Sequence, residues 1–460
     1  MISVRSRARG LACGLLLVVG SHALAQATPL TLSDALAALP ASPAWHQADL
    51  TYRSAADALA AARAAAGLSV SGGGSYDRTD TIAGTGGRSG ATAKVSISAA
   101  TTVLPWAPAE ASIANAEISL HIAALTRDST RASLVLSLEQ EYFAARLAAT
   151  AQGVAQAADT QAQAKLAAAR AQRAQGQLSA AGLAQAEATA AGASAALAQA
   201  QSSLELARQA LFGTLGTPVT DAPLATAPPQ APGPTAALQQ LLASAVGSRD
   251  DVKSAELRVA QAQATLSASA AERWIPSASL SVGVGGTDST GAAAGPSVSA
   301  GLDFQKGVLS GTASYPVAPG TAATSTQLSV GVAVTIPLDA PSASAAVQSA
   351  RTAVQSAQAA LAATRSAAEL DIRQRYASWQ GARATLSADQ AAESAAKQSL
   401  DTVKAQLDAG LATSLDVGAA QVAYQQAQRT VESDQNALYL ALLQLRNALG
   451  ELQVPPGGQP

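Results

Sequence analysis

Apolar residues recur at helical spacing along two long stretches that contain no proline, residues 109–217 and 342–454. The spaced residues include Leu134, Leu138 and Tyr142 in the first stretch and Leu438, Leu442, Leu445 and Leu449 in the second. The leucines of the second group follow a 4-3-4 rhythm, which is the seam pattern of a coiled coil. If the first stretch is one helix as far as Gln175, it extends about 100 Å, well beyond an ordinary globular domain.

Before each long stretch, the period of the pattern shortens to two residues. Apolar residues alternate with small or polar residues in four segments, residues 68–71, 95–98, 280–284 and 328–334. Each segment predicts a strand with one apolar face. In a transmembrane barrel this face would meet lipid and the Ser, Thr and Gly face would line a wet lumen, whereas in a soluble sandwich the apolar face would pack on a core.

The chain also contains itself twice, at a fixed offset of 234 residues. This offset places Tyr142 on Tyr376 and Gly176 on Gly410. Each copy reads helix, strand pair, very long helix, glycine break and helix. A duplicated unit of this length indicates a tandem architecture and not one compact enzyme domain.

These features divide the chain into five parts. We expect a signal peptide at 1–25, a first repeat at 26–217, a proline-rich linker at 218–235, a second repeat at 236–450 and a disordered tail at 451–460. In the first repeat the strand pair should occupy about 68–105 and the helical hairpin about 108–213; in the second, about 274–337 and 341–449. The linker contains six prolines and should be extended.

The first 25 residues have the composition of an export signal. Arg5, Arg7 and Arg9 precede an apolar run from Leu11 to Val19, and Ala23-Leu24-Ala25 is a small-residue cleavage site. Cys13 would be removed with this segment. No later stretch has the roughly 18 to 20 consecutive apolar residues of a transmembrane helix, so an exported chain of this kind should span a membrane with strands.

Composition and candidate chemistry argue against an enzyme. Charged residues make up 13% of the chain and the formal net charge is −2, so nothing indicates nucleic acid as a partner. His46 and His121 lack neighbours at metal-ligand spacing, and Glu139 and Glu141 point to different helix faces. We therefore predict no catalytic residue, no metal and no cofactor, and a cell-envelope hydrolase is only a distant alternative.

Four strands cannot close a barrel, so several chains should contribute to one. The second strand region has extra strand-like pieces at about 297–304 and 308–314. We interpret them as a surface loop hairpin, and the pattern leaves open whether they enter the membrane. Trp106 and Trp274 stand beside prolines at strand-helix boundaries, where aromatic residues suit the interfacial girdle of an outer-membrane barrel. Each Trp is about equally well explained as a packing residue at the end of an element.

The two glycine breaks lie in the segments Ala405-Gln-Leu-Asp-Ala-Gly410-Leu-Ala-Thr-Ser-Leu-Asp416-Val417 and Ala171-Gln-Arg-Ala-Gln-Gly176-Gln-Leu-Ser179. Both segments resemble the tip motif of the TolC family of outer-membrane efflux channels. The resemblance covers nearly the whole mature chain. It implies a mostly α-helical homotrimer in the outer membrane, with a 12-stranded β-barrel continued by a coiled-coil α-helical tunnel in the periplasm. It also implies a periplasmic adaptor protein as partner and, through it, an inner-membrane pump.

The same resemblance assigns roles at the tips. Gly176, Ser179, Gly410 and Thr413 would form adaptor-docking turns. Asp416 would line the tunnel entrance. Apart from the resemblance, Arg173 lies three residues before the first tip glycine and could pair with acidic groups on a neighbouring helix to hold the tunnel closed. The simpler alternatives are turn glycines without a partner, a solvated Asp in the first turn of a helix and a free surface Arg.

We therefore predict a passive exit duct for a tripartite efflux or type I secretion system, in contact with outer-membrane lipid. The pump would supply the energy, and the helical tips would splay to open the duct. The alternative is an exported coiled-coil structural or adhesin-like protein without a channel. The pattern leaves the cargo, the pump and the ion selectivity open.

Overall fold

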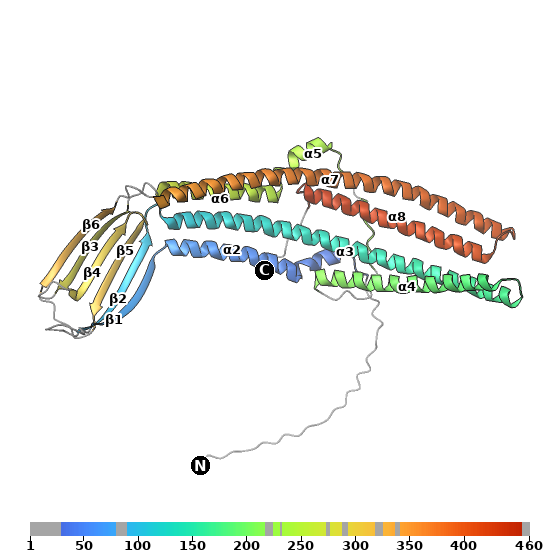
Figure 1. The fold of residues 1–460 in the computed structure, drawn as a ribbon, viewed down its shortest axis with the longest axis horizontal. Helices are drawn as coiled ribbons and strands as arrows, with labels where there is room; N and C mark the ends of the chain where they lie inside the picture. The colour runs from blue at the N-terminus through green and yellow to red at the C-terminus, as the bar shows by residue number, and fades with distance from the viewer. Residues whose placement is uncertain are drawn as a thin grey trace, which may run out of the picture.

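The computed structural model describes most of the chain beyond the predicted signal peptide. The described residues are 29–79, 90–216, 224–230, 232–272, 277–287, 293–317, 325–335 and 341–452. Trp274 and the predicted signal peptide lie outside them. A β-sheet forms one end of an elongated body, and long helices run away from it (Figure 1).

The helices of the first repeat are α1 (Leu32–Ala38), α2 (Pro43–Ala66), α3 (Pro108–Ala174) and α4 (Ala180–Leu215), with a 3-10 turn at Leu39–Ala41. The two longer helices that flank the strands of this repeat, α2 and α3, begin with residues that favour a helix start. The Ser42 side chain accepts a hydrogen bond from the Trp45 amide and so caps α2. Proline opens both α2 and α3, where its missing N–H has no helical partner to lose. The 67 residues of α3 extend about 100 Å, as predicted.

The second repeat follows the same order. Its helices are α5 (Leu238–Ala245), α6 (Asp250–Glu272), α7 (Pro341–Asp408) and α8 (Ser414–Ala448). At 68 residues, α7 matches α3 in length and also begins with proline. The duplicated arrangement predicted from the sequence is confirmed, except that the second repeat contains an additional strand pair.

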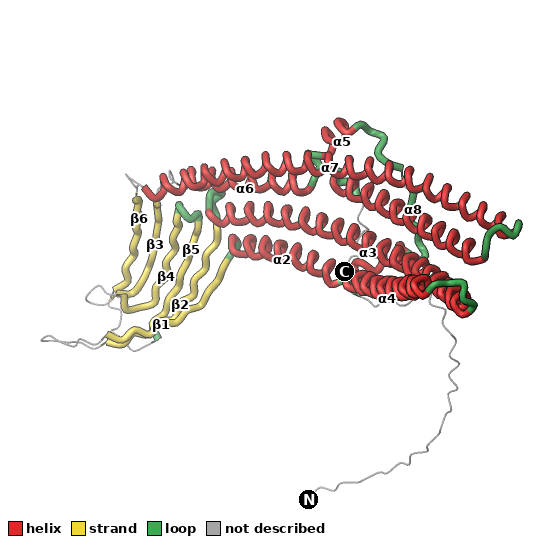
Figure 2. Tube along the Cα trace, turned by 45° about the vertical axis from the view of Figure 1, so that its right-hand side comes forward, coloured by secondary structure: helices red, strands yellow, loops and turns green. Residues whose placement is uncertain are grey.

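The helices that join the sheet form a layer in the order α2, α3, α6 and α7, because each packs on the next. Farther from the sheet, α4 lies along α3 and α8 lies along α7 (Figure 2). Helix α8 also packs against α3. The two helical hairpins are therefore joined along their length by α3.

The described residues form one antiparallel sheet of six strands in the order β1-β2-β5-β4-β3-β6. The strands are β1 (Ser69–Thr79), β2 (Gly90–Thr102), β3 (Ser277–Thr287), β4 (Ala293–Asp303), β5 (Val308–Pro316) and β6 (Ser325–Thr335). The four predicted strands are present.

The interpretation of residues 297–314 as a surface loop hairpin is wrong. These residues form most of β4 and β5, which lie in the middle of the sheet between β2 and β3. The described residues thus form six strands where the sequence predicts four. Alternation identified the strands, but only their pairing places them in the sheet.

Tyr142 joins three segments at the middle of the molecule. Its hydroxyl donates to the carbonyl oxygen of Leu30 at 2.8 Å and accepts from the amide of Thr226 at 3.1 Å. The ring lies in a cluster with Phe143 and Leu138. In the second repeat the matching cluster surrounds Trp379, against which the linker backbone at Gly233 packs closely. The described part of the linker therefore connects the cores of the two repeats.

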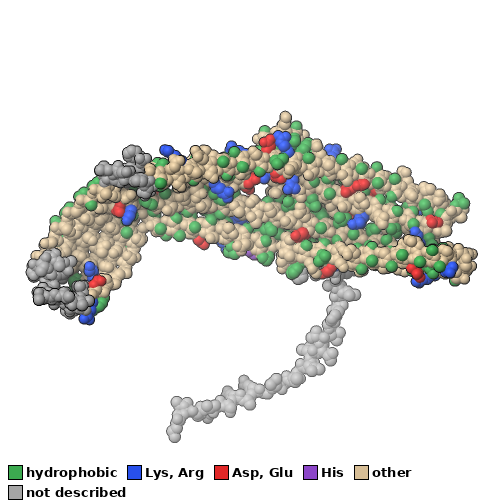
Figure 3. Space-filling model, viewed as in Figure 1, with side chains coloured by type: hydrophobic (Ala, Val, Ile, Leu, Met, Phe, Trp, Pro, Cys, Tyr) green, Lys and Arg blue, Asp and Glu red, His purple; other side chains and the backbone are tan. Residues whose placement is uncertain are grey.

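Charged side chains are scattered over the visible face of the helices without one dominant sign (Figure 3). This distribution agrees with the low charge content of the sequence. No helix among the described residues is both long enough and apolar enough to cross a membrane.

Candidate functional site

The two helical hairpins turn at the end of the molecule farthest from the sheet (Figure 1). At the first tip, α3 ends and Gly176 takes the left-handed conformation, with φ of 76°. The amide of Gln177 then donates to the carbonyl of Gln172 at 2.9 Å, which satisfies the helix end. Ser179 caps α4 by accepting from the Gly182 amide at 3.0 Å. The predicted glycine turn is confirmed.

The second tip has the same backbone but a stronger cap. Gly410 has φ of 75°, and the Leu411 amide donates to the carbonyl of Gln406 at 2.8 Å. Thr413 and Asp416 form a capping box in which the carboxylate accepts from the Thr413 hydroxyl at 2.7 Å and its amide at 2.8 Å. These hydrogen bonds lower the pKa of Asp416. The structure therefore places Asp416 in the first turn of α8 as a capping residue.

Both tips expose their turns to solvent. Apart from the glycine itself and its two chain neighbours, no residue has a heavy atom within 4 Å of the position that a Cβ would take at Gly176 or Gly410. Leu411 beside the second glycine is 81% exposed, whereas Leu178 of the first tip is half-buried against Gly182. The second tip therefore presents an exposed leucine beside its glycine, whereas the leucine of the first tip is half-buried.

Arg173 stabilises its own turn. Its guanidinium Nη1 donates to the carbonyl of Leu178 at 3.0 Å. Within this chain the side chain therefore bridges the first tip, and its predicted role in holding the entrance closed stays a prediction. An ion pair between α3 and α4 joins Arg170 and Glu187 at 3.6 Å.

A clamp between the hairpins lies just behind the second tip, and sequence reasoning missed it. The Gln161 amide on α3 donates to the carbonyl of Leu415 on α8 at 2.6 Å. The same amide packs so closely on Gly418 that any side chain there would collide with it. Lys165, one turn farther along α3, lowers the pKa of Asp416 through its charge. A glycine inside the first turns of α8 was the one sequence signal that could have indicated this close approach.

Ionisable groups are partly buried midway between tips and sheet, where α3, α7 and α8 meet. The Tyr439 hydroxyl donates to the Glu139 carboxylate at 2.8 Å, and burial raises the pKa of both groups. Partial burial and the neighbouring Asp389 carboxyl raise the pKa of Asp434 to about 6. Two carboxyl groups in contact resist double ionisation.

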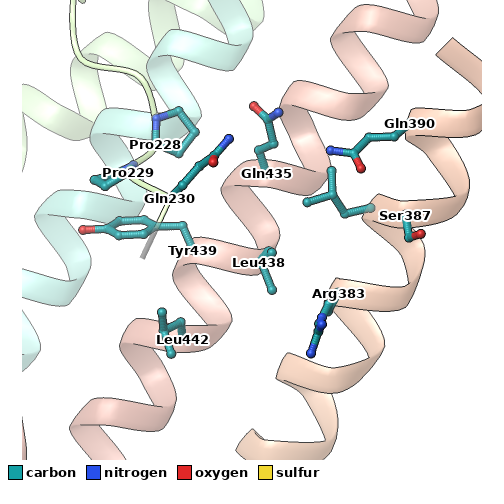
Figure 4. A pocket seen from close by; sticks show the side chains of 11 residues that line it. Pro228, Pro229, Gln230, Arg383, Ser387, Gln390, Gln435, Leu438, Tyr439 and Leu442 are labelled. Atoms are coloured by element: carbon teal, nitrogen blue, oxygen red, sulfur yellow. The ribbon is translucent and has the colours of Figure 1, made fainter. Parts of the chain in front are cut away.

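A cavity of about 350 Å³ lies beside this region, between the linker and helices α7 and α8 (Figure 4). Its lining mixes amides with apolar groups and includes Pro228, Gln230, Arg383, Gln390, Leu438 and Tyr439. Among the described residues, no group of three or more His, Cys, Asp or Glu side chains could hold a metal ion. The lining therefore offers packing and amide hydrogen bonds to a ligand and no evident catalytic pair.

Trp106 lies between β2 and α3, at the boundary where the sequence placed it. Its indole Nε1 donates to the carbonyl of Phe304 at 2.8 Å, and 47% of the residue is exposed. The hydrogen bond joins the start of α3 to the β4–β5 turn. A membrane-interface role for Trp106 stays a prediction. The sequence predicts the same role for Trp274 of the second repeat, which lies outside the described residues.

Comparison with known proteins identifies the fold. The sequence model of the outer membrane efflux protein family matches residues 36–217 and 241–451. The Campylobacter jejuni CmeC outer membrane channel superposes with a TM-score of 0.71 at 15% identity, covering 93% of this chain and 87% of that one. The open state of the Neisseria gonorrhoeae MtrE channel superposes with a TM-score of 0.67 at 19% identity, covering 92% and 89%.

The outer membrane protein VceC from Vibrio cholerae is similar as well, with a TM-score of 0.65, 19% identity and coverage of 91% of this chain and 96% of that one. No curated protein sequence matches the chain. The structural matches show the fold, and the two stretches of the family match coincide with the two repeats.

Proposed function

The chain belongs to the outer membrane efflux protein family, and from this premise we propose how three copies work together as an outer-membrane exit duct. Localisation in the outer membrane and service as an efflux duct follow from the family. The proposal concerns the assembly and its tips. Three sheets close one barrel, three sets of helices close one tunnel, and a periplasmic adaptor docks where the tunnel ends.

The observation that carries this proposal is the separation of the two ends of the chain's fold. A sheet with one apolar face lies at one end, and two solvent-exposed glycine turns lie at the other, separated by helices of 67 and 68 residues. At 1.5 Å per residue, such helices place the turns about 100 Å from the sheet. With the sheet in the outer membrane, the turns lie deep in the periplasm, within reach of a soluble partner.

The tips suit docking because their backbones are already ordered. Gly176 and Gly410 take the left-handed conformation, and Ser179 and Thr413 cap the helices that follow. A partner that binds a preformed turn loses little conformational entropy on binding. Leu411 adds an exposed apolar group at the second tip, so we assign the larger share of the adaptor contact to that tip.

Opening then requires the second hairpin to move away from the first near the tips. Among the contacts between α3 and α8, the Gln161 hydrogen bond to Leu415 lies behind the second tip, so it must break when the tips separate. The duct itself is passive, since energy enters through a pump bound to the adaptor. An Asp carboxyl is ionised at neutral pH, and the capping hydrogen bonds lower the pKa of Asp416 further. Three copies at the entrance therefore contribute three negative charges.

The assembly is tested with purified protein in planar lipid bilayers and by native mass spectrometry. We expect a detergent-dependent trimer with discrete single-channel conductance. A monomer that stays soluble without detergent and conducts no ions would contradict the duct.

The docking assignment needs a separate experiment. A photo-crosslinking amino acid is placed at Leu411, and at Leu206 as the control, because Leu206 is 66% exposed on α4 away from the turns. In cells we expect Leu411 to crosslink to a periplasmic adaptor and Leu206 to give no such product. Equal crosslinking from both positions would remove the tip assignment and leave the duct standing.

A further inference from the structure

The second repeat carries a β-hairpin, β4–β5, that has no counterpart among the described residues of the first repeat. Strands β3 and β6 pair with each other along their whole length, from Ser277 opposite Thr335 to Thr287 opposite Ser325. Strands β4 and β5 arise from the connection between them and add to the other edge of β3. Strand β5 then pairs with β2. The inserted hairpin therefore separates the strands of the two repeats, which would otherwise meet.

The inserted strands continue the two-faced pattern of their neighbours. Because residues directly opposite each other in an antiparallel pair share a face, the registers trace rows across the sheet. One row is apolar and runs through Ile97, Ala313, Val298, Val284 and Leu328. The adjacent row is polar or small and runs through Ser98, Thr312, Ser299, Gly283 and Ser329.

This distribution is that of a membrane-embedded barrel wall, with Val, Leu and Ile on the lipid side and Ser, Thr and Gly on the lumen side. A loop hairpin in water would gain nothing from an apolar face aligned with that of the sheet. Val298 is 62% exposed and Leu309 is 45% exposed in the single chain, so no other described element covers this face. The alignment indicates that β4 and β5 share the lipid contact of the other four strands.

The turn of the inserted hairpin is fixed at the level where strands meet helices. The carbonyl of Gly307 accepts from the amide of Val103 at 2.8 Å, and the carbonyl of Phe304 accepts from the indole of Trp106. Gly307 has φ of 65° and lies against Leu104 and Ala107, where a side chain would not fit. The hairpin is thus bonded to the start of α3 and spans the height of the sheet.

Six strands also match the width of the helical layer better than four. The layer α2, α3, α6 and α7 is about 32–40 Å wide at an interaxial spacing of 8–10 Å. Strands spaced by about 4.8 Å and tilted by about 40° occupy about 38 Å as a set of six and about 25 Å as a set of four. The inserted pair fills the sheet above the contact between α3 and α6.

We infer that the β4–β5 hairpin is part of the barrel wall, and that β1 of one chain pairs with β6 of a second copy to close the barrel. This inference rests on the three-chain duct proposed above. Three chains of six strands give an 18-stranded barrel about 36 Å across at the backbone, compared with about 24 Å for 12 strands. The wider, hydroxyl-lined exit suits bulky cargo that is not selected by charge.

Cysteine labelling tests which face each strand residue presents. Cys13 is the only cysteine of the sequence and lies in the predicted signal peptide. Single substitutions Ser299→Cys and Ala300→Cys report on β4, and Ser96→Cys and Ile97→Cys report on β2 as the matched control. Trimers in lipid vesicles are treated with a membrane-impermeant maleimide. In both pairs we expect the serine position to label at least about fivefold faster than its neighbour, because only it faces water.

Three outcomes are distinguishable. Alternation in both strands supports the inference. Alternation in β2 with equal, fast labelling of both β4 positions would overturn the inserted hairpin as wall and leave the proposed duct intact. Equal labelling in both strands would overturn the duct itself.

A deletion provides the second measurement. Removing residues 293–316 leaves β3 and β6 paired and lets β3 meet β2. Electron-microscopic images of the trimer should then show the barrel narrowing from about 36 Å to about 24 Å, in proportion to strand number. An unchanged diameter would show that the hairpin lies outside the wall. If the deleted chain does not assemble, the labelling result on the full chain decides.

Discussion

The two helical tips share one backbone design and differ in what holds them. The first tip is stabilised within its own hairpin, by Arg173 bound to its turn and by the Arg170–Glu187 pair between its helices. The second tip has the capping box of Thr413 and Asp416, and Gln161 of the other hairpin binds behind it. These contacts of the first tip therefore stay within one hairpin, whereas the contact behind the second tip crosses to α3 of the other hairpin. A contact between hairpins can break without unfolding either, so the second tip is the one suited to movement.

Proline at the tip glycine should have the largest effect. Gly410→Pro forces φ from 75° to about −65° and removes the amide that donates to Leu407, which costs about 3 kcal/mol locally. We expect trimers to form and insert, but efflux to be lost. The measurement is cargo accumulation in cells alongside trimer content of the outer membrane.

The matched control is Ser414→Pro, four residues away at the first position of α8, where proline is tolerated. It should leave efflux near the unsubstituted level. Equal loss of efflux in both variants, or normal efflux by inserted Gly410→Pro, would contradict a special role for the second turn.

Breaking the clamp between the hairpins should have a moderate effect. Gln161→Ala removes one hydrogen bond to Leu415, worth about 1 kcal/mol, which corresponds to an about fivefold rise in the open population. Single-channel recordings at low voltage measure that population. Gln163→Ala is the control, because Gln163 lies on the same helix and bonds instead to Ser194 within the first hairpin.

Gly418→Ala tests the same contact between the hairpins from the side of α8. The added methyl displaces the Gln161 amide, whereas alanine strengthens the helix by about 1 kcal/mol relative to glycine. We expect little change in thermal stability but an opening similar to that of Gln161→Ala, and no further opening in the double variant. Gly192→Ala, which has no close neighbour, should stabilise α4 without changing conductance. Additive opening in the double variant would show that the two residues act separately.

The stability of the middle of the second hairpin should depend on pH, with a smaller and more gradual effect than the substitutions above. The pKa of Asp434 is raised to about 6, so the folded state holds its proton more tightly than the unfolded chain does. The stabilisation is present at low pH and is lost as pH rises through 6. Amide exchange in α7 and α8 should be slower at pH 5 than at pH 7 after correction for intrinsic rates, and Asp434→Asn should remove the difference. The same comparison in α3 and α4 provides the internal reference.

The smallest effect concerns the capping box. Because the pKa of Asp416 is lowered from 3.8, its contribution is present above that value and is lost as pH falls through the lowered pKa. Below pH 4 the first turn of α8 should fray, whereas the first turn of α4, capped by the uncharged Ser179, should not. Amide exchange resolved to these two turns measures the contrast, and Asp416→Asn should make them alike.

Local features of this fold could be predicted because they depend on local chemistry. Pro108 and Pro341 mark helix starts, and Gly176 and Gly410 mark helix ends, through backbone geometry alone. The position of each strand in the sheet, which depends on contacts between distant segments, could not be predicted. Alternation in residues 297–314 is the same for a separate loop hairpin and for strands inside the main sheet, and only the pairing with β2 and β3 distinguishes the two.

The candidate site was only partly predictable for the same reason. Gln161 and Leu415 are 254 residues apart, and no spacing rule connects them. Asp416 suited both an entrance ring and a helix cap, and the structure shows the cap within one chain. The adaptor contacts of the four tip residues and the entrance role of Arg173 stay predictions.

The linker that joins the cores at Tyr142 and Trp379 has a mechanical consequence. Because the linker contacts both clusters, it limits how far the two hairpins can separate near Tyr142 and Trp379. We therefore expect the hairpins to move relative to each other by rotating about the linker. From Tyr142 to Gly176, α3 forms a lever arm of about 50 Å, and a rotation of about 10° at the linker displaces the turn by about 9 Å. A small change in packing where the linker contacts the two clusters would thereby produce a large displacement of the helical tips.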